Sequence, residues 1–172
     1  MSNAIYCIAA NRAAAGSIVD GLKSAGFAAS EISVLMADQA GTREFAEDKD
    51  TTVPEGAATG AGAGIGLGAV LGWLAGIGML AIPGVGPFIA AGPIMGALGG
   101  AAAGGAIGGV IGALVSMGVP EEEAKVYDSR IQSGGVLVSV HTESPNQILA
   151  AKEIFRRAGA ENINSTGAVV TA

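Results

Sequence analysis

Apolar positions change from strand spacing to helical spacing and back within the first 37 residues. Residues 4–9 are a short apolar run that predicts a strand, and Asn11 is suited to be the N-cap of a helix. Residues 31–37 alternate larger and smaller side chains, which predicts a half-buried strand. The predicted helix between them ends at Gly26 and has an apolar face made of Ala15, Ile18, Val19 and Leu22.

The same plan of strand, helix and strand recurs near the end of the chain. Residues 137–142 predict a strand, and residues 163–170 can supply a final one. Between them, Ser144, Pro145 and Gln147 fit the N-cap, the first helical position and the capping box of a helix that ends at Gly159. The apolar face of this helix consists of Ile148, Ala151, Phe155 and Ala158. A further helix over residues 121–133 precedes this unit.

The two units align at a constant offset of 133 residues, which indicates an internal βαβ duplication. Asn11 then corresponds to Ser144, and Gly26 to Gly159. The predicted fold class is therefore α+β, with a ferredoxin-like layout in which the helices cover one face of the sheet. The duplication is split by a long insert.

Charge separates the insert from the rest of the chain, because residues 56–120 contain no Asp, Glu, Lys, Arg or His. We predict four parts: a first βαβ half at 1–37, a polar linker at 38–55, an uncharged α-helical hairpin at 56–118, and a helix plus the second βαβ half at 119–172.

Glycine recurs at every fourth position in two runs of the uncharged part. The runs are equidistant from Gly84, which lies between Pro83 and Pro87, so we expect a turn there that places the runs opposite each other. Small residues at this spacing let helix backbones approach closely, as in glycine zippers. The predicted helix-packing positions are Gly56, Gly60, Gly64, Gly68, Gly72, Gly76, Gly92, Gly96, Gly100, Gly104, Gly108 and Gly112.

The predicted arms favour a membrane, although a soluble assembly stays open. Each arm of about 24 to 26 residues would form roughly 36 to 39 Å of helix, which can cross a hydrocarbon core of about 30 Å. Arg43, Lys49 and Lys125 flank the arms and favour a cytoplasmic α/β domain. The alternative is a water-soluble particle in which hairpins pack together. In either case the apolar residues beside the glycines would face lipid or other subunits, among them Ile65, Leu67, Leu71, Leu74, Ile77, Ile94, Leu98, Ile107, Ile111 and Leu114.

Composition argues against nucleic acid and against common catalytic sites. The net charge of −6 and the pI near 4.6 provide no basic surface for phosphates. Cys7 is the single cysteine and His141 the single histidine, so we expect a buried thiol and a half-exposed strand histidine and predict no metal site. Gly60 and Gly62 lack the third glycine of a dinucleotide-binding loop, so no cofactor is expected.

Three segments resemble the bacterial general-stress or heat-induced stress protein family. They are PEGAATGAGAG at 54–64, AIPGVGPFIAAGP at 81–93, and MGVPEEEAKVYDSRIQSGGVLVSVHT at 117–142. The resemblance implies a small α/β domain joined to a glycine-rich hairpin, and it brings no catalytic residues. We therefore expect a non-enzymatic, stress-related structural or interaction protein that self-associates through the hairpin in the bacterial inner membrane. The alternatives are a soluble self-assembling particle in the cytoplasm and a membrane-anchored α/β domain that senses a ligand or partner.

Overall fold

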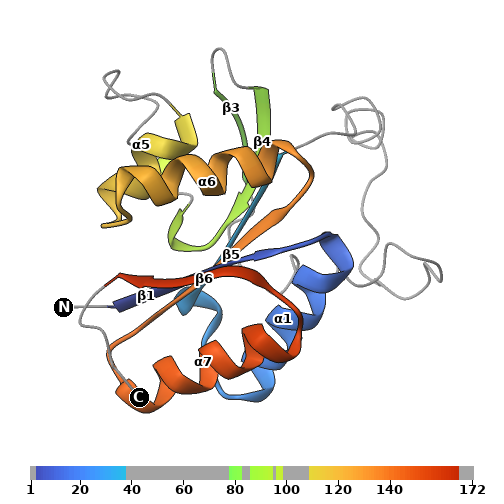
Figure 1. Ribbon diagram of the computed structural model, residues 1–172, viewed down its shortest axis with the longest axis vertical. Coiled ribbons are helices and arrows are strands. Elements are labelled where there is room, and N and C mark those ends of the chain that lie inside the picture. Colours follow the sequence, from blue (N-terminus) through green and yellow to red (C-terminus); the bar gives the residue numbers. More distant parts are fainter. Residues whose placement is uncertain (1–2, 38–77, 83–85, 95, 99–108, 167–172) are drawn as a thin grey trace, which may run out of the picture.

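The computed structural model describes residues 3–37, 78–82, 86–94, 96–98 and 109–166, and these build one antiparallel sheet between two layers of helices (Figure 1). The order of the six strands is β3-β4-β2-β5-β1-β6. An α+β fold is thus confirmed. In chain order the elements are β1 (Asn3–Ala9), α1 (Arg12–Ser24), the 3-10 turn η1 (Ala29–Glu31), β2 (Ile32–Ala37), β3 (Gly78–Ile82), β4 (Gly86–Ala91), α5 (Gly109–Ser116), α6 (Glu121–Gln132), β5 (Val136–Thr142), α7 (Pro145–Arg157) and β6 (Glu161–Thr166).

The repeat detected in the sequence has matching element bounds. Adding 133 to the bounds of β1 and α1 gives the bounds of β5 and α7. Both helices end before a glycine with positive φ, Gly26 at 89° and Gly159 at 70°, a conformation that glycine adopts at little cost. The last strands differ, because β6 begins at Glu161 and ends at Thr166, whereas we predicted a strand at 163–170. Residues 167–170 lie outside the described part of the chain.

The two equivalent helices begin differently. The Asn11 side chain accepts a hydrogen bond from the Ala14 N–H at 2.9 Å, so the predicted N-cap is confirmed. Ser144 occupies the N-cap position of α7, but its side chain makes no capping bond. Gln147 instead accepts a hydrogen bond from the Thr142 hydroxyl, which also accepts from the Ser144 N–H at 3.2 Å. The predicted capping box is therefore wrong, because Thr142 at the end of β5 engages Gln147.

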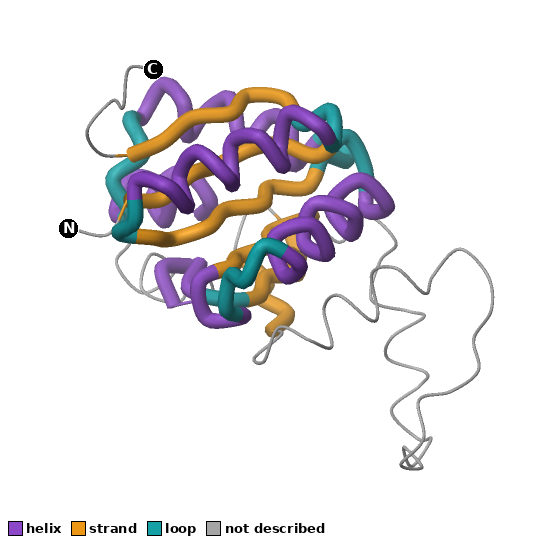
Figure 2. The backbone as a smooth tube through the Cα atoms, turned by 90° about the horizontal axis from the view of Figure 1, so that it is seen from below, coloured by secondary structure: helices purple, strands orange, loops and turns teal. Residues whose placement is uncertain are grey.

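Helices α1 and α7 cover one face of the sheet, as predicted, and Figure 2 views the fold from their side. Gly21 of α1 lies close to Ile154 of α7. The core beneath them joins both helices to the inward side chains of four strands, among them Ile5, Cys7, Ile18, Leu22, Val34, Ile89, Val138, Val140, Ile148 and Phe155.

The opposite face is covered as well, so the prediction of helices on one face is wrong. Helices α5 and α6, together with helical residues 93–94 and 96–98, pack on it (Figure 1). Strand β2 is consequently buried on both sides, with Ser33 and Leu35 as inaccessible as Val34, rather than half-buried. The second core consists of Ala4, Tyr6, Ile8, Leu35, Phe88, Ala90, Ile94, Leu98, Val110, Ala113, Leu114, Val119, Ala124, Tyr127, Ile131 and Leu137.

The prediction of a helical hairpin is wrong at residues 78–82 and 86–91, because these residues form the strands β3 and β4. Strand β4 pairs with both β3 and β2, so its backbone is satisfied by ladder hydrogen bonds. Its side chains follow a period of two, with Phe88 and Ala90 in one core and Ile89 and Ala91 in the other. Glycine and Pro87 disfavour a helix here, while the free edge of β2 offers a partner.

Candidate functional site

The two repeats meet where β1 pairs with β5, and the centre of this pairing is polar. The register runs from Asn3 opposite Thr142 to Ala9 opposite Val136, so its midpoint is the pair Tyr6 and Ser139. Both side chains point to the face covered by α5 and α6. Tyr6 is 1% exposed and Ser139 is fully buried.

Three hydroxyl-bearing residues form a row across the strands at this level, and we call Ser33, Ser139 and Tyr6 the hydroxyl row. Ser33 lies opposite Ser139 in the β2–β5 pairing, and Ser139 lies opposite Tyr6. The Ser33 Oγ accepts a hydrogen bond from the Ile94 N–H at 3.2 Å. The Ser139 and Tyr6 hydroxyls have no hydrogen-bond partner among the residues that the structure describes. Unsatisfied buried hydroxyls are costly, so the row is the most unusual chemical feature of this core.

Tyr127 of α6 covers the row and ties the helix to β6. Its ring centroid lies 6.1 Å from that of Tyr6, and its hydroxyl donates to the Asn162 carbonyl oxygen at 2.9 Å. Burial raises the pKa of Tyr6 to about 12 and also raises the pKa of Tyr127, an effect that a hydrogen bond with the Asn164 side chain opposes. Both phenols are therefore neutral at ordinary pH.

Cys7 and His141 have the environments predicted for them. Cys7 is fully buried in the α1–α7 core, and burial raises the pKa of its thiol, which makes it a poor nucleophile. His141 is half-buried near the end of β5. Burial lowers the pKa of its imidazole, and a backbone hydrogen bond with Glu31 opposes that shift.

Among the predicted helix-packing glycines, only Gly92, Gly96 and Gly112 lie in the described residues. Gly92 follows β4 with φ at 81°, and a Cβ there would lie 2.1 Å from the Ile32 carbonyl oxygen, so this close approach is to a strand. Gly96 is exposed, with open space around the position of a Cβ. Gly112 is half-buried within α5. The remaining positions lie outside the described residues: Gly56, Gly60, Gly64, Gly68, Gly72, Gly76, Gly100, Gly104 and Gly108.

The predicted turn lies between β3 and β4. Residues 83–85, which include Pro83 and Gly84, lie outside the described residues. Pro87 belongs to β4 and pairs with Ala81 of β3. On the other side of β4, the described pairing with β2 extends to Ala37 opposite Phe88, the residue that follows Pro87.

The apolar residues predicted to face lipid or other subunits are partly internal. Ile94, Leu98 and Leu114 are buried in the core beneath α5 and α6, and Ile111 is packed against it. That expectation is wrong for these four residues, because the sheet supplies the surface that buries them. Ile65, Leu67, Leu71, Leu74, Ile77 and Ile107 are outside the described residues. Within the described part, no helix is both long and apolar enough to cross a membrane.

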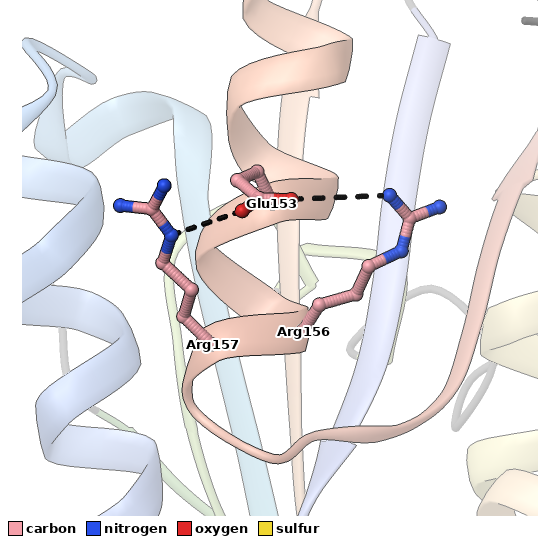
Figure 3. Close-up of polar contacts among 3 residues, drawn as sticks. All are labelled: Glu153, Arg156 and Arg157. Carbon is pink, nitrogen blue, oxygen red and sulfur yellow. Dashed lines mark hydrogen bonds and ion pairs between the residues drawn. The ribbon is translucent and has the colours of Figure 1, made fainter.

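Charged side chains at the helix ends pair with near neighbours. Lys125, one of the three cations used to orient the domain, lies 2.9 Å from Glu121 and 3.5 Å from Glu122. On α7, Glu153 accepts from the Arg157 Nε at 2.9 Å and lies 4.0 Å from Arg156 (Figure 3). All these groups are exposed, so the pairs contribute little to stability. Arg43 and Lys49 lie outside the described residues.

No group of three or more metal-ligating side chains occurs among the residues for which the structure gives a placement. Comparison with known proteins adds no relative: no family model, curated protein or solved structure matches the chain.

The sequence reasoning missed the hydroxyl row. The repeat offset of 133 residues relates Tyr6 to Ser139, so a signal for that pair was present, but nothing in the sequence placed Ser33 beside them. Chemically, the row contains neutral hydroxyl groups that can donate and accept hydrogen bonds. Within the described residues, the row packs against Tyr127 of α6 and holds the backbone of Ile94 by a hydrogen bond, so it connects the sheet to the second helical layer.

Proposed function

We propose that this chain is a non-enzymatic structural or interaction protein that associates with copies of itself. The main support is the division between a fully packed domain and an uncharged remainder. In the domain, Tyr6, Cys7 and Tyr127 are buried in neutral form, and several exposed charges on α6 and α7 pair with near neighbours. The stress-related role implied by the family resemblance belongs to the same proposal.

We also propose that the domain is a ferredoxin-like duplication interrupted by an insert. Support comes from the order β2-β5-β1-β6, in which all neighbours are antiparallel, and from α1 and α7 on one face as the two crossovers. Part of the insert, β3, β4 and α5, adds to the sheet edge and to the second helical layer.

The proposal of self-association is supported by the uncharged residues that remain, 56–77 and 99–108. They are rich in glycine and alanine and carry no charge to keep them in water. Small residues of this kind are stabilised by close packing with a like surface, which a second copy provides.

Measuring the particle mass of the untagged full-length protein, with and without detergent, tests the proposal. A homogeneous multimer in both conditions supports self-association, and a monomer at micromolar concentration contradicts it. A variant with Gly68 and Gly72 both changed to Asp introduces charge into the remainder and is expected to lower the mass. The matched control changes Ala13 and Ser17, both exposed on α1, to Asp, and is expected to leave the mass unchanged.

A second candidate is attachment to the bacterial inner membrane with the α/β domain on the cytoplasmic side, either as a structural subunit or as a sensor of a ligand or partner. The observation that favours it is the length of the uncharged residues 56–77, because about 20 apolar residues can span a bilayer. Fractionation of cells that express the untagged chain tests this candidate. Recovery in the membrane fraction after a carbonate wash supports it, whereas a soluble, detergent-independent particle contradicts it.

A further inference from the structure

The sheet ends in two strands that differ in how their outer edges are protected. Within the described residues, β6 pairs only with β1, and β3 pairs only with β4. An edge strand exposes N–H and C=O groups that can pair with another chain unless a structural feature prevents it.

Strand β6 carries several such features. Its pairing with β1 shifts register between Tyr6 and Ile8, and Asn162 has a φ of 50°, so the strand is irregular at its start. Glu161 adds a charge, which lies 3.3 Å from Arg130 of α6. The Asn162 carbonyl oxygen is already occupied by the Tyr127 hydroxyl. Another strand would have to displace these interactions to extend the sheet at β6.

Strand β3 lacks these features. It pairs with β4 through five consecutive residue pairs without a register shift, from Gly78 opposite Ala90 to Ile82 opposite Gly86. Its sequence GMLAI contains neither a charged residue nor proline. In Figure 1 it lies at the outer edge of the sheet beyond β4. Among the described residues the outer edge of β3 is therefore unpaired, regular and neutral.

We propose that β3 provides a further contact between copies of this chain, beside the uncharged residues 56–77 and 99–108, by pairing antiparallel with the β3 strand of a second copy to form a continuous sheet. This inference rests on the proposed self-association and names one of its contacts. A twofold axis through such a contact places each residue opposite the one at the same distance on the other side of the axis, so only a residue at the axis faces its own copy. A strand without charge has no register in which like charges meet. Every register between two copies of β3 is therefore free of like-charge contacts, whereas at β6 a register centred near Glu161 would bring two glutamates together.

Single cysteines introduced along the strand test the contact in the full-length protein. Met79→Cys, Leu80→Cys and Ala81→Cys are each oxidised mildly, alone and in pairwise mixtures, and non-reducing electrophoresis measures the disulfide-linked dimer. Cys7 can stay in place because it is fully buried. The matched control is Ser165→Cys, at the opposite sheet edge. We expect most of the chain to be crosslinked for at least one β3 combination and only a background fraction for the control.

Particle mass separates this inference from the proposed function. A multimer without crosslinking at β3, or with equal crosslinking at Ser165, overturns the β3 contact and leaves self-association standing; it would also mean that another surface or another segment of the same chain covers β3. A monomer overturns both. As a second measurement, Met79→Lys introduces like charges at the contact and is expected to raise the dimer dissociation constant several-fold. An unchanged dissociation constant contradicts the β3 contact.

Discussion

Tyr6 and Ser139 are equivalent positions of the internal repeat, and they lie directly opposite each other across β1 and β5. The pseudo-twofold axis that relates the two βα units therefore passes between them. Both hydroxyls are buried without a described partner, on the face that α6 covers. The junction of the repeats is thus a polar point within an otherwise apolar core.

Removing these two hydroxyls is expected to cost little. Tyr6→Phe and Ser139→Ala delete groups that gain no hydrogen bond in the fold but lose hydration, so each variant should be neutral or more stable by up to about 1 kcal/mol. Tyr127→Phe is the control, since it loses the bond to the Asn162 carbonyl and should destabilise by about 1 kcal/mol. Urea unfolding measures all three. A cost for Tyr6→Phe equal to that for Tyr127→Phe would show that the Tyr6 hydroxyl has a partner.

Two glycines of the predicted helix-packing series should respond oppositely to alanine. Gly92→Ala forces a side chain onto a backbone with positive φ and against the Ile32 carbonyl oxygen, and should cost at least about 2 kcal/mol. Gly96→Ala meets open space in a helical segment and should be neutral or stabilising by up to about 1 kcal/mol. Thermal and urea unfolding distinguish them. Equal effects would indicate that Gly92 does not make this close approach.

Ser33→Ala should destabilise the junction between β2 and the residues after β4. The change removes the acceptor of the buried Ile94 N–H and should cost about 1 to 3 kcal/mol. Ser17→Ala is the control, because Ser17 is exposed and donates to a carbonyl within its own helix. Hydrogen exchange of the Ile94 amide provides a local readout. Unchanged protection of this amide in Ser33→Ala would contradict the described contact.

Stability is expected to fall at alkaline pH. Burial raises the pKa of Cys7 above its usual 9.0, and that of Tyr6 from 10.0 to about 12, so the folded state holds these protons more tightly than the unfolded chain. Above about pH 9 the unfolded chain ionises first, and each such group lowers the free energy of unfolding by about 1.4 kcal/mol per pH unit until its folded-state pKa is reached. Urea unfolding between pH 8 and 11 measures the slope. Tyr6→Phe should reduce it above pH 10, and an unchanged slope would exclude Tyr6 as a source.

Replacing residues 56–118 with a flexible linker should prevent stable folding. The deletion removes β4 and α5, and thereby exposes Leu35, Leu137 and Tyr6 on the second face of the sheet. A smaller deletion, of residues 40–70, leaves every described contact in place and is expected to fold. Amide NMR spectra of both variants provide the measurement. A well-dispersed spectrum for the larger deletion would show that the second layer is dispensable.

Local signals in the sequence were sufficient for the repeated unit. These signals are the N-cap at Asn11, the glycines that end α1 and α7, and the apolar spacing of both helices. They correctly predicted the two helices and the helix faces that pack on the sheet. They work because capping, glycine conformation and helical periodicity involve residues only a few positions apart.

The structure that the uncharged segment adopts was decided by tertiary contacts. The glycine spacing predicted a helical hairpin at 56–118 with its turn at Pro83 to Pro87, yet residues 88–91 pair with β2, residues 78–82 pair with β4, and Gly92 is required by a backbone contact rather than by helix packing. Ser33 likewise acquires its role from Ile94, which is 61 residues away in the chain. Because glycine is a weak helix former, local propensity does not decide between helix and strand in this segment. The nearest unsatisfied strand edge and apolar face then determine the structure, because the long-range hydrogen bonds and buried area they offer outweigh the small differences in local propensity.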